Sequence, residues 1–250
     1  MLKEIKNLLA FLTIIPFGMD QGYLTDAANY MPLFPLVGAL IGLLAGVVAW
    51  LLSFVFPDLI LGMLTLGFLL IVTGLHHTDG LLDFADGLMF QGPPEKKIEI
   101  MHDQRTGAGG VALGLITLLT TAFCIAELRR SITPQSLIVS EISAKLAMVV
   151  GAWAGRSAHG GMNTFFVNAM HSHRRELHLA VALVISFGIA LPLLGITGLI
   201  AVITALVASL ALVIVSNRHF GGITGDAMGA MNDIVRMFSL LSILGAVRWW

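Results

Sequence analysis

The chain has 250 residues, of which 57% are hydrophobic and 12% are charged, and its mean hydropathy is +0.90. An ordinary soluble domain carries about 25% charged residues. This composition therefore excludes an ordinary soluble domain and indicates an integral membrane protein. The formal net charge of -1 argues against a nucleic-acid partner held by bulk electrostatics, and membrane lipid is the first partner to expect.

The first twelve residues have the pattern of a helix that lies in the membrane interface. Apolar side chains recur at helical spacing: Leu2, Ile5, Leu8, Leu9 and Leu12. Polar side chains fall on the opposite face: Lys3, Glu4, Lys6 and Asn7. Such a two-sided helix is typical of the boundary between lipid and water. A short tilted helix that enters the bilayer is the alternative.

Long apolar stretches follow, and a helix needs about 20 mostly apolar residues to cross a bilayer. The candidate spans are residues 33–56, 59–75, 109–127, 137–154, 179–196, 199–216 and 234–250. The fifth and sixth are joined by a tight turn at Gly195–Gly198. We therefore expect an all-α fold, a polytopic integral membrane helical bundle of about seven transmembrane helices plus the N-terminal interfacial helix, in a single domain over residues 1–250.

The basic residues predict which side each loop occupies. With the N-terminus in the cytoplasm, ten of them fall on the cytoplasmic side: Lys3, Lys6, Lys96, Lys97, Arg105, Arg156, Arg174, Arg175, Arg218 and Arg236. Three fall on the far side, Arg129, Arg130 and Arg248, and Lys145 lies within a span. This bias follows the positive-inside rule. It predicts a multi-pass protein of the cell (inner or cytoplasmic) membrane with its active site facing the cytoplasm.

The first polar segment after a span carries three aspartates. In GLHHTDGLLDFADGL, residues 74–88, Asp79, Asp83 and Asp86 are spaced i, i+4, i+7, so a helix would place all three carboxylates on one face. Like charges so close call for a cation, and carboxylate oxygens without cysteine favour Mg²⁺, or Mn²⁺ as a substitute. A solvated helix face is the alternative. His76 and His77 do not make a zinc site by themselves.

Two further polar segments carry groups suited to phosphate. EIMHDQRTGAGG supplies Asp103 and Arg105, and a helix beginning after Gly107 would point free N–H groups at an anion, although such glycines also cap or pack helices. NRHFGGITGDAMGAMND supplies Arg218, several glycines, Asp226, Asn232 and Asp233. Carboxylates, basic groups and glycine-rich loops on one membrane face predict divalent-metal chemistry on a pyrophosphate.

For two other charged features, a structural role is the preferred interpretation. Glu141 and Lys145 are i, i+4 within a predicted span, and an ion pair would lower the cost of burying either charge. A role in substrate binding is the alternative. The basic run HSHRRELH, residues 171–178, fits a loop that faces lipid headgroups or sets sidedness, with attraction of an anionic substrate as the alternative.

Five motifs follow one another along nearly the whole chain. They are FLTIIP at 11–16, FPLVGALIGLL at 34–44, HTDGLLDFADGL at 77–88, IMHDQRTGAGG at 100–110 and GGITGDAMGA at 221–230. In this order they resemble the cobalamin synthase family, the adenosylcobinamide-GDP ribazoletransferases. Two positions depart from the family pattern. Ile14 stands where the family often has an arginine, which puts a phosphate contact there in doubt, and His76 adds a histidine beside His77.

The resemblance implies a multi-pass helical enzyme that uses Mg²⁺ to join adenosylcobinamide-GDP to α-ribazole or α-ribazole 5′-phosphate. The ribazole 3′-hydroxyl would attack the cobinamide phosphate, giving adenosylcobalamin or its 5′-phosphate and releasing GMP. The resemblance leaves open which aspartate is the general base. It also leaves open whether the chain forms a homo-oligomer or binds other enzymes of the corrinoid pathway.

Carried over position by position, the resemblance implies the residues of the site. The catalytic residues would be Asp79, Asp83, Asp86 and Asp103, and the first three would hold the metal. The substrate-binding residues would be His77, Arg105, Gly107, Arg156, Arg218, Gly225, Asp226 and Asp233.

Two other classes of protein also present acidic residues from membrane helices. The CDP-alcohol phosphotransferases use D-G-x-x-A-R-x8-G-x3-D-x3-D, which fails here because DGLLDFADG has no arginine after the first Asp-Gly pair. A cation transporter could use Asp79, Asp83, Glu141 and Lys145 as an ion path. The clustering of the acidic residues at one membrane surface argues against this interpretation.

Overall fold

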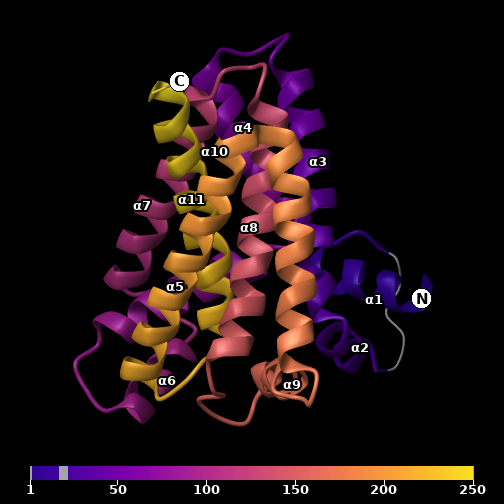
Figure 1. Cartoon of the computed structure of the whole chain (residues 1–250). Coiled ribbons are helices and arrows are strands. Elements are labelled where there is room, and N and C mark those ends of the chain that lie inside the picture. Colours follow the sequence, from indigo (N-terminus) through magenta and orange to yellow (C-terminus); the bar gives the residue numbers. More distant parts are fainter. Residues whose placement is uncertain (1, 17–21, 250) are drawn as a thin grey trace.

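The computed structural model describes residues 2–16 and 22–249, and within these ranges its regular secondary structure is helical. Long helices stand side by side as one bundle, and short helices gather at one end of it (Figure 1). The long helices are α3 (Phe34–Leu52), α4 (Asp58–Val72), α7 (Ala108–Glu127), α8 (Thr133–Ala154), α10 (Arg175–Phe220) and α11 (Gly225–Trp249). The predicted all-α polytopic membrane fold is confirmed.

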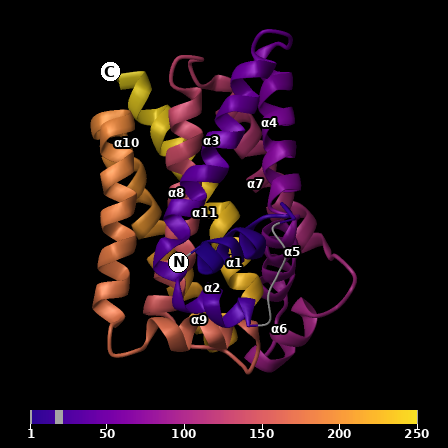
Figure 2. The same cartoon turned by 90° about the vertical axis from the view of Figure 1, so that its right-hand side faces the viewer.

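The short elements cover the lower end of the bundle in Figures 1 and 2. They are α1 (Leu2–Leu12), α2 (Tyr23–Asn29), the 3₁₀ turn η1 (Met31–Leu33), α5 (His76–Met89), α6 (Pro94–Met101) and α9 (Met162–Met170). The turns at the other end connect α3 to α4 and α7 to α8. The polar, irregular parts of the chain are therefore concentrated at one end.

Five helices in the described part of the chain are long and apolar enough to cross a membrane, or six if α4 and α5 form one bent span. One of the five, α10, is interrupted at Gly195, whose φ of 58° is left-handed. It folds back there into two legs (Figure 1), and a Cβ at Gly198 would overlap the carbonyl of Ala190. The predicted tight turn is present. The predicted count of seven spans stays a prediction, and residue 250 of the last one lies outside the described residues.

A sharp bend separates α4 from α5. The two helices meet at 95°, because Gly74 (φ 67°) and Leu75 (φ 61°) both adopt left-handed backbone conformations. Glycine takes this conformation without strain, whereas leucine does so only when its surroundings enforce it. The bend turns the helix that carries Asp79, Asp83 and Asp86 away from the axis of α4.

The last helix begins nine residues before the predicted start at residue 234. Thr224 caps it, since its hydroxyl accepts a hydrogen bond from Ala227 N at 3.0 Å. The glycine-rich segment is thus helical and packs on α5: a Cβ at Gly229 would lie 3.0 Å from the carbonyl oxygen of His77. Small residues allow two backbones to approach closely. The prediction of a polar loop over residues 217–233 is correct only for residues 221–224, because residues 217–220 belong to α10 and α11 begins at Gly225.

The N-terminal helix α1 packs more deeply than its amphipathic pattern predicts. Leu8 and Leu12 are buried as expected, but so is Asn7, which was predicted to lie on the polar face. Asn7 Nδ2 donates a hydrogen bond of 2.8 Å to Asp26 of α2, so its polar group has a partner inside the protein. Ile5 is 39% exposed instead. The side chain of Leu2 lies outside the described part of the chain.

The bundle interior holds a network of charged and polar side chains that joins α5, α8 and α11. Lys145 Nζ lies 3.4 Å from Glu141 and donates to Asn232 at 2.6 Å. The Arg236 guanidinium contacts both Glu141 and Asp233, the latter at 2.7 Å. Two cations therefore balance two anions in a region where solvent exposure is at most 1%.

This network confirms the predicted Glu141–Lys145 pair and corrects the placement of two other residues. Arg236 was predicted to lie on the cytoplasmic side, and Asp233 in a polar loop, but both are buried within α11. Asp233 also accepts hydrogen bonds from Asn232 (2.9 Å) and from Thr78 of α5 (2.8 Å). Asp233 and Arg236 are also close in sequence, at i, i+3, but the predicted span boundary at residue 234 separated them, so the sequence did not indicate their pairing.

Replacing Arg236 with Met should destabilise the protein strongly, because Glu141 and Asp233 would be left with a single cation between them. Breaking a buried ion pair from one side costs about 3–5 kcal/mol. The matched control is Arg130→Met, which removes an exposed pair with Asp58 (2.8 Å) that should contribute about 0–1 kcal/mol. Thermal unfolding in detergent gives the melting temperature of each variant. Equal melting temperatures for the two variants would contradict the prediction.

Candidate active site

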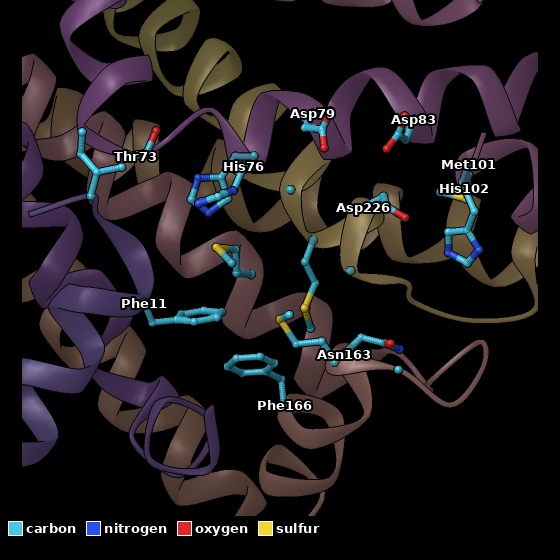
Figure 3. Close-up of a pocket in the computed structure, with 18 of the residues that line it drawn as sticks. Phe11, Thr73, His76, Asp79, Asp83, Met101, His102, Asn163, Phe166 and Asp226 are labelled. Atoms are coloured by element: carbon cyan, nitrogen blue, oxygen red, sulfur yellow. The ribbon is translucent and has the colours of Figure 1, made fainter. Parts of the chain in front are cut away.

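A cavity of about 1250 Å³ opens at the end of the bundle where the short helices gather. Its walls come from α1, the start of α5, the segment after α6, α9 and the first turns of α11. Figure 3 shows the side chains that face it. The cavity brings together segments from residue 10 to residue 229, so it depends on the packing of the whole bundle.

One wall of the cavity is acidic. Asp79 and Asp83 project from successive turns of α5, Asp226 faces them from α11, and Asp103 belongs to the same lining (Figure 3). The two helices can approach because a Cβ at Gly80 would lie only 3.0 Å from the Asp226 backbone. Thus four of the predicted site residues, from three separate segments, meet around one space.

These carboxylates affect one another electrostatically. Asp83 lies on α5, outside the five helices long and apolar enough to span a membrane. Burial raises the pKa of its carboxyl group to about 7, and the negative charges of Asp79, Asp226 and Asp86 contribute. A cation placed among these groups would relieve both the desolvation and the repulsion.

The third aspartate of the motif makes a different set of contacts. Asp86 does not belong to the cavity lining; its two oxygens accept hydrogen bonds from Gly107 N (2.6 Å) and Gly110 N (2.8 Å) at the start of α7. The free amides predicted to bind a phosphate therefore bind a carboxylate of the protein itself. A carboxylate at a helix N-terminus accepts hydrogen bonds from unpaired N–H groups and interacts favourably with the positive end of the helix dipole.

The other predicted substrate-binding residues fall into two groups. His77 and Gly225 line the cavity, and the buried Nδ1 of His77 has no hydrogen-bond partner in the described structure. The following do not line it: Arg105, Gly107, Arg156, Arg218 and Asp233. Of these, Arg156 Nε donates to the Gly221 carbonyl at 2.7 Å, which ties the loop after α8 to the loop before α11.

Sequence reasoning missed two histidines and an asparagine that line the cavity. His102 and His159 come from different loops, and their rings meet edge to face with centroids 5.6 Å apart. Asn163 of α9 donates hydrogen bonds to Ser157 Oγ (2.8 Å) and the Ile223 carbonyl (2.7 Å). His102 precedes Asp103 in the motif IMHDQRTGAGG, but nothing in the sequence pairs it with His159.

The oxygen ligands of the acidic wall fit a magnesium ion that is shared with a substrate. Among the residues that the structure describes, no three Asp, Glu, His or Cys side chains are already arranged to hold a metal. Mg²⁺ is commonly bound by one or two carboxylates, waters and substrate phosphates rather than by a closed protein cage. Asp79, Asp83 and Asp226 supply carboxylates of that kind around a space large enough for a nucleotide.

Comparison with known proteins identifies the family. The cobalamin-5-phosphate synthase family matches residues 4–244. The chain belongs to this family. Proteins named adenosylcobinamide-GDP ribazoletransferase are similar over nearly their whole length: one from Methanocella arvoryzae is 33% identical (100% of this chain, 97% of the relative). One from Syntrophobacter fumaroxidans is 35% identical (93% and 94%), and one from Thermococcus kodakarensis is 32% identical (98% and 99%). No solved structure matches the chain.

The different contacts of Asp83 and Asp86 predict opposite effects on stability in this family member. Asp86→Asn replaces an acceptor oxygen by an NH₂ group that faces a backbone N–H, which should cost about 1–3 kcal/mol. Asp83→Asn removes a charge from a crowded acidic wall and should leave stability unchanged or raise it. Thermal unfolding in detergent without divalent cations measures both. A larger loss for Asp83→Asn than for Asp86→Asn would contradict the assignment.

Proposed function

We propose that this chain joins adenosylcobinamide-GDP to α-ribazole or α-ribazole 5′-phosphate, gives adenosylcobalamin or its 5′-phosphate, and releases GMP. The observation that carries the proposal is the acidic wall, in which α5 and α11 bring Asp79, Asp83 and Asp226 to one cavity in a chain of this family. The reaction needs that arrangement because it cleaves a pyrophosphate, whose negative charges must be neutralised.

The proposed reaction is a displacement at phosphorus. The 3′-hydroxyl of the ribazole forms a new O–P bond to the cobinamide phosphate, the bond from that phosphorus to the bridging oxygen breaks, and GMP leaves with the electron pair. Mg²⁺, when bound, would neutralise the pyrophosphate oxygens and the charge that develops on the leaving group. The hydroxyl proton passes to a carboxylate of the acidic wall.

The residues of the chain would divide this work as follows. Asp79, Asp83 and Asp226 are the carboxylates available to hold Mg²⁺ and to receive the proton, since they face the same cavity. His77 would hydrogen-bond to a substrate through its unpartnered ring nitrogen. Asp86 would act indirectly, by fixing α5 against the start of α7. It would then be a positioning residue instead of the metal ligand that its place in the motif suggests.

The cavity would face the cytoplasm, where a nucleotide-activated substrate is accessible. The basic residues of the sequence favour this orientation in the cell membrane. The corrin substrate would then enter from the cytoplasmic surface beside α1, whose axis lies across the long helices in Figure 2.

The test is turnover by purified protein in detergent or proteoliposomes. GMP release from adenosylcobinamide-GDP should require both α-ribazole (or its phosphate) and Mg²⁺. Asp79→Asn should lower kcat by about 100-fold or more, because several kcal/mol of charge stabilisation are lost. Asp58→Asn is the control, because Asp58 is exposed and is the first residue of α4, next to the turn that connects α3 to α4 at the end of the bundle away from the short helices. Absence of joined product from folded wild-type protein would overturn the proposed function.

A second measurement separates the carboxylates that hold the cation from the one that accepts the proton. Mn²⁺ binding, followed by electron paramagnetic resonance in the presence of adenosylcobinamide-GDP, should weaken in variants of the holding residues. Asn variants of Asp79, Asp83 and Asp226 are compared in parallel. A variant that binds Mn²⁺ normally but does not turn over identifies the proton acceptor, whereas normal Mn²⁺ binding by all three would contradict a metal site in this wall.

A further inference from the structure

The wall of the cavity that faces the carboxylates is apolar and aromatic. We call it the aromatic wall and define it by Phe11 of α1, Met148 of α8, and Met162 and Phe166 of α9. The rings of Phe11 and Phe166 lie 5.2 Å apart at an angle of 34°, and Figure 3 shows them across the cavity from Asp79 and Asp83. A cation or phosphate group at the carboxylates does not require an apolar surface. A different chemical group is therefore expected to bind to the aromatic wall.

The packing behind the aromatic wall holds the two rings in place. Phe34 of α3 lies 6.1 Å from the Phe11 ring and 6.0 Å from the Phe166 ring, and it is fully buried. Phe166 is only 3% exposed, whereas Phe11 is partly open toward the cavity. The methionines can adapt their shape and contact an aromatic ring favourably through sulfur. The wall thus presents a supported surface for a flat apolar group.

Two polar side chains of this region already have partners. The Thr13 hydroxyl donates to the Leu9 carbonyl at 2.7 Å, and the amide of Asn163 donates to Ser157 and Ile223. A guanine ring would bring several donors and acceptors that must be satisfied when they leave water. The benzimidazole of α-ribazole is a fused aromatic pair whose edge carries methyl groups and a single free ring nitrogen. The chemistry of this wall therefore favours benzimidazole over guanine.

We propose, on the basis of the proposed function, that the aromatic wall binds the benzimidazole base of α-ribazole and that Phe11 and Phe166 determine specificity for it. With its base on this wall, the nucleoside directs its ribose across the cavity toward Asp79, Asp83 and Asp226. The 3′-hydroxyl then approaches the carboxylates, and the guanine nucleotide occupies the more polar part of the cavity.

Direct binding tests the assignment without turnover. Isothermal titration of α-ribazole into purified protein, with neither Mg²⁺ nor adenosylcobinamide-GDP, gives the dissociation constant. Loss of an aromatic partner for a stacked base weakens binding by about 5- to 150-fold, and Phe11→Leu, which keeps an apolar side chain, should weaken it by about tenfold. The matched control is Phe165→Leu, since Phe165 neighbours Phe166 but is 49% exposed and lies outside the cavity lining. Guanosine should not displace α-ribazole from the wild-type protein.

Steady-state kinetics add a readout that a merely structural role would not change. Phe11→Leu should raise KM for α-ribazole by about tenfold, with kcat and KM for adenosylcobinamide-GDP nearly unchanged. Phe166→Leu serves as the second variant and should show the same pattern. An unchanged dissociation constant in Phe11→Leu, displacement by guanosine, or a rise in KM for adenosylcobinamide-GDP alone would overturn the assignment.

These outcomes are separable from those that test the reaction. Turnover that is insensitive to Phe11→Leu would overturn the aromatic-wall assignment and leave the proposed function intact. Binding of α-ribazole that depends on Phe11, in a protein that releases no GMP, would support the assignment and overturn the proposed reaction. Failure of the wild-type protein to bind α-ribazole would overturn the assignment.

Discussion

The buried charge network is the constraint on which the site depends. Arg236 of α11 pairs with Glu141 of α8, and Asp233 of α11 accepts a hydrogen bond from Thr78 of α5. These groups are buried in the bundle and have no water to replace a lost partner, so a shift of one helix along another would leave a charge or polar group unpaired. The observed register places Asp226, seven residues before Asp233, opposite the aspartates of α5.

Close backbone contact between α5 and α11 then brings their carboxylates together in one wall of the cavity. Small residues let two helix backbones approach closely, which strengthens packing between helices. Gly80 and Gly229 provide that packing between α5 and α11, and Gly42 does so between α3 and α8, where a Cβ would lie 2.5 Å from Ile138 Cα. Gly80 and Gly229, one in each acidic motif, are thus explained by helix contact.

Helix α5 is held at several points along its length. Thr78 bonds to α11, Asp86 caps α7, and the buried Lys97 of α6 donates to the carbonyls of Leu88 (3.2 Å) and Phe90 (2.5 Å) at the end of α5. Between these attachments, Asp79 and Asp83 face the cavity. A helix fixed in this way can keep like charges close together, because the free energy of the surrounding contacts offsets their repulsion.

The sequence alone determined the class of fold, the membrane setting, the tight turn at Gly195 and the acidic motifs, because hydropathy, turn chemistry and residue spacing are local properties. Only the tertiary structure decided the different contacts of Asp83 and Asp86, the burial of Arg236, and the meeting of Phe11 with Phe166. A helical spacing specifies which side chains share a face. It does not specify which neighbour that face meets, because many of the neighbours are distant in the sequence, such as Glu141 and Arg236, which are 95 residues apart.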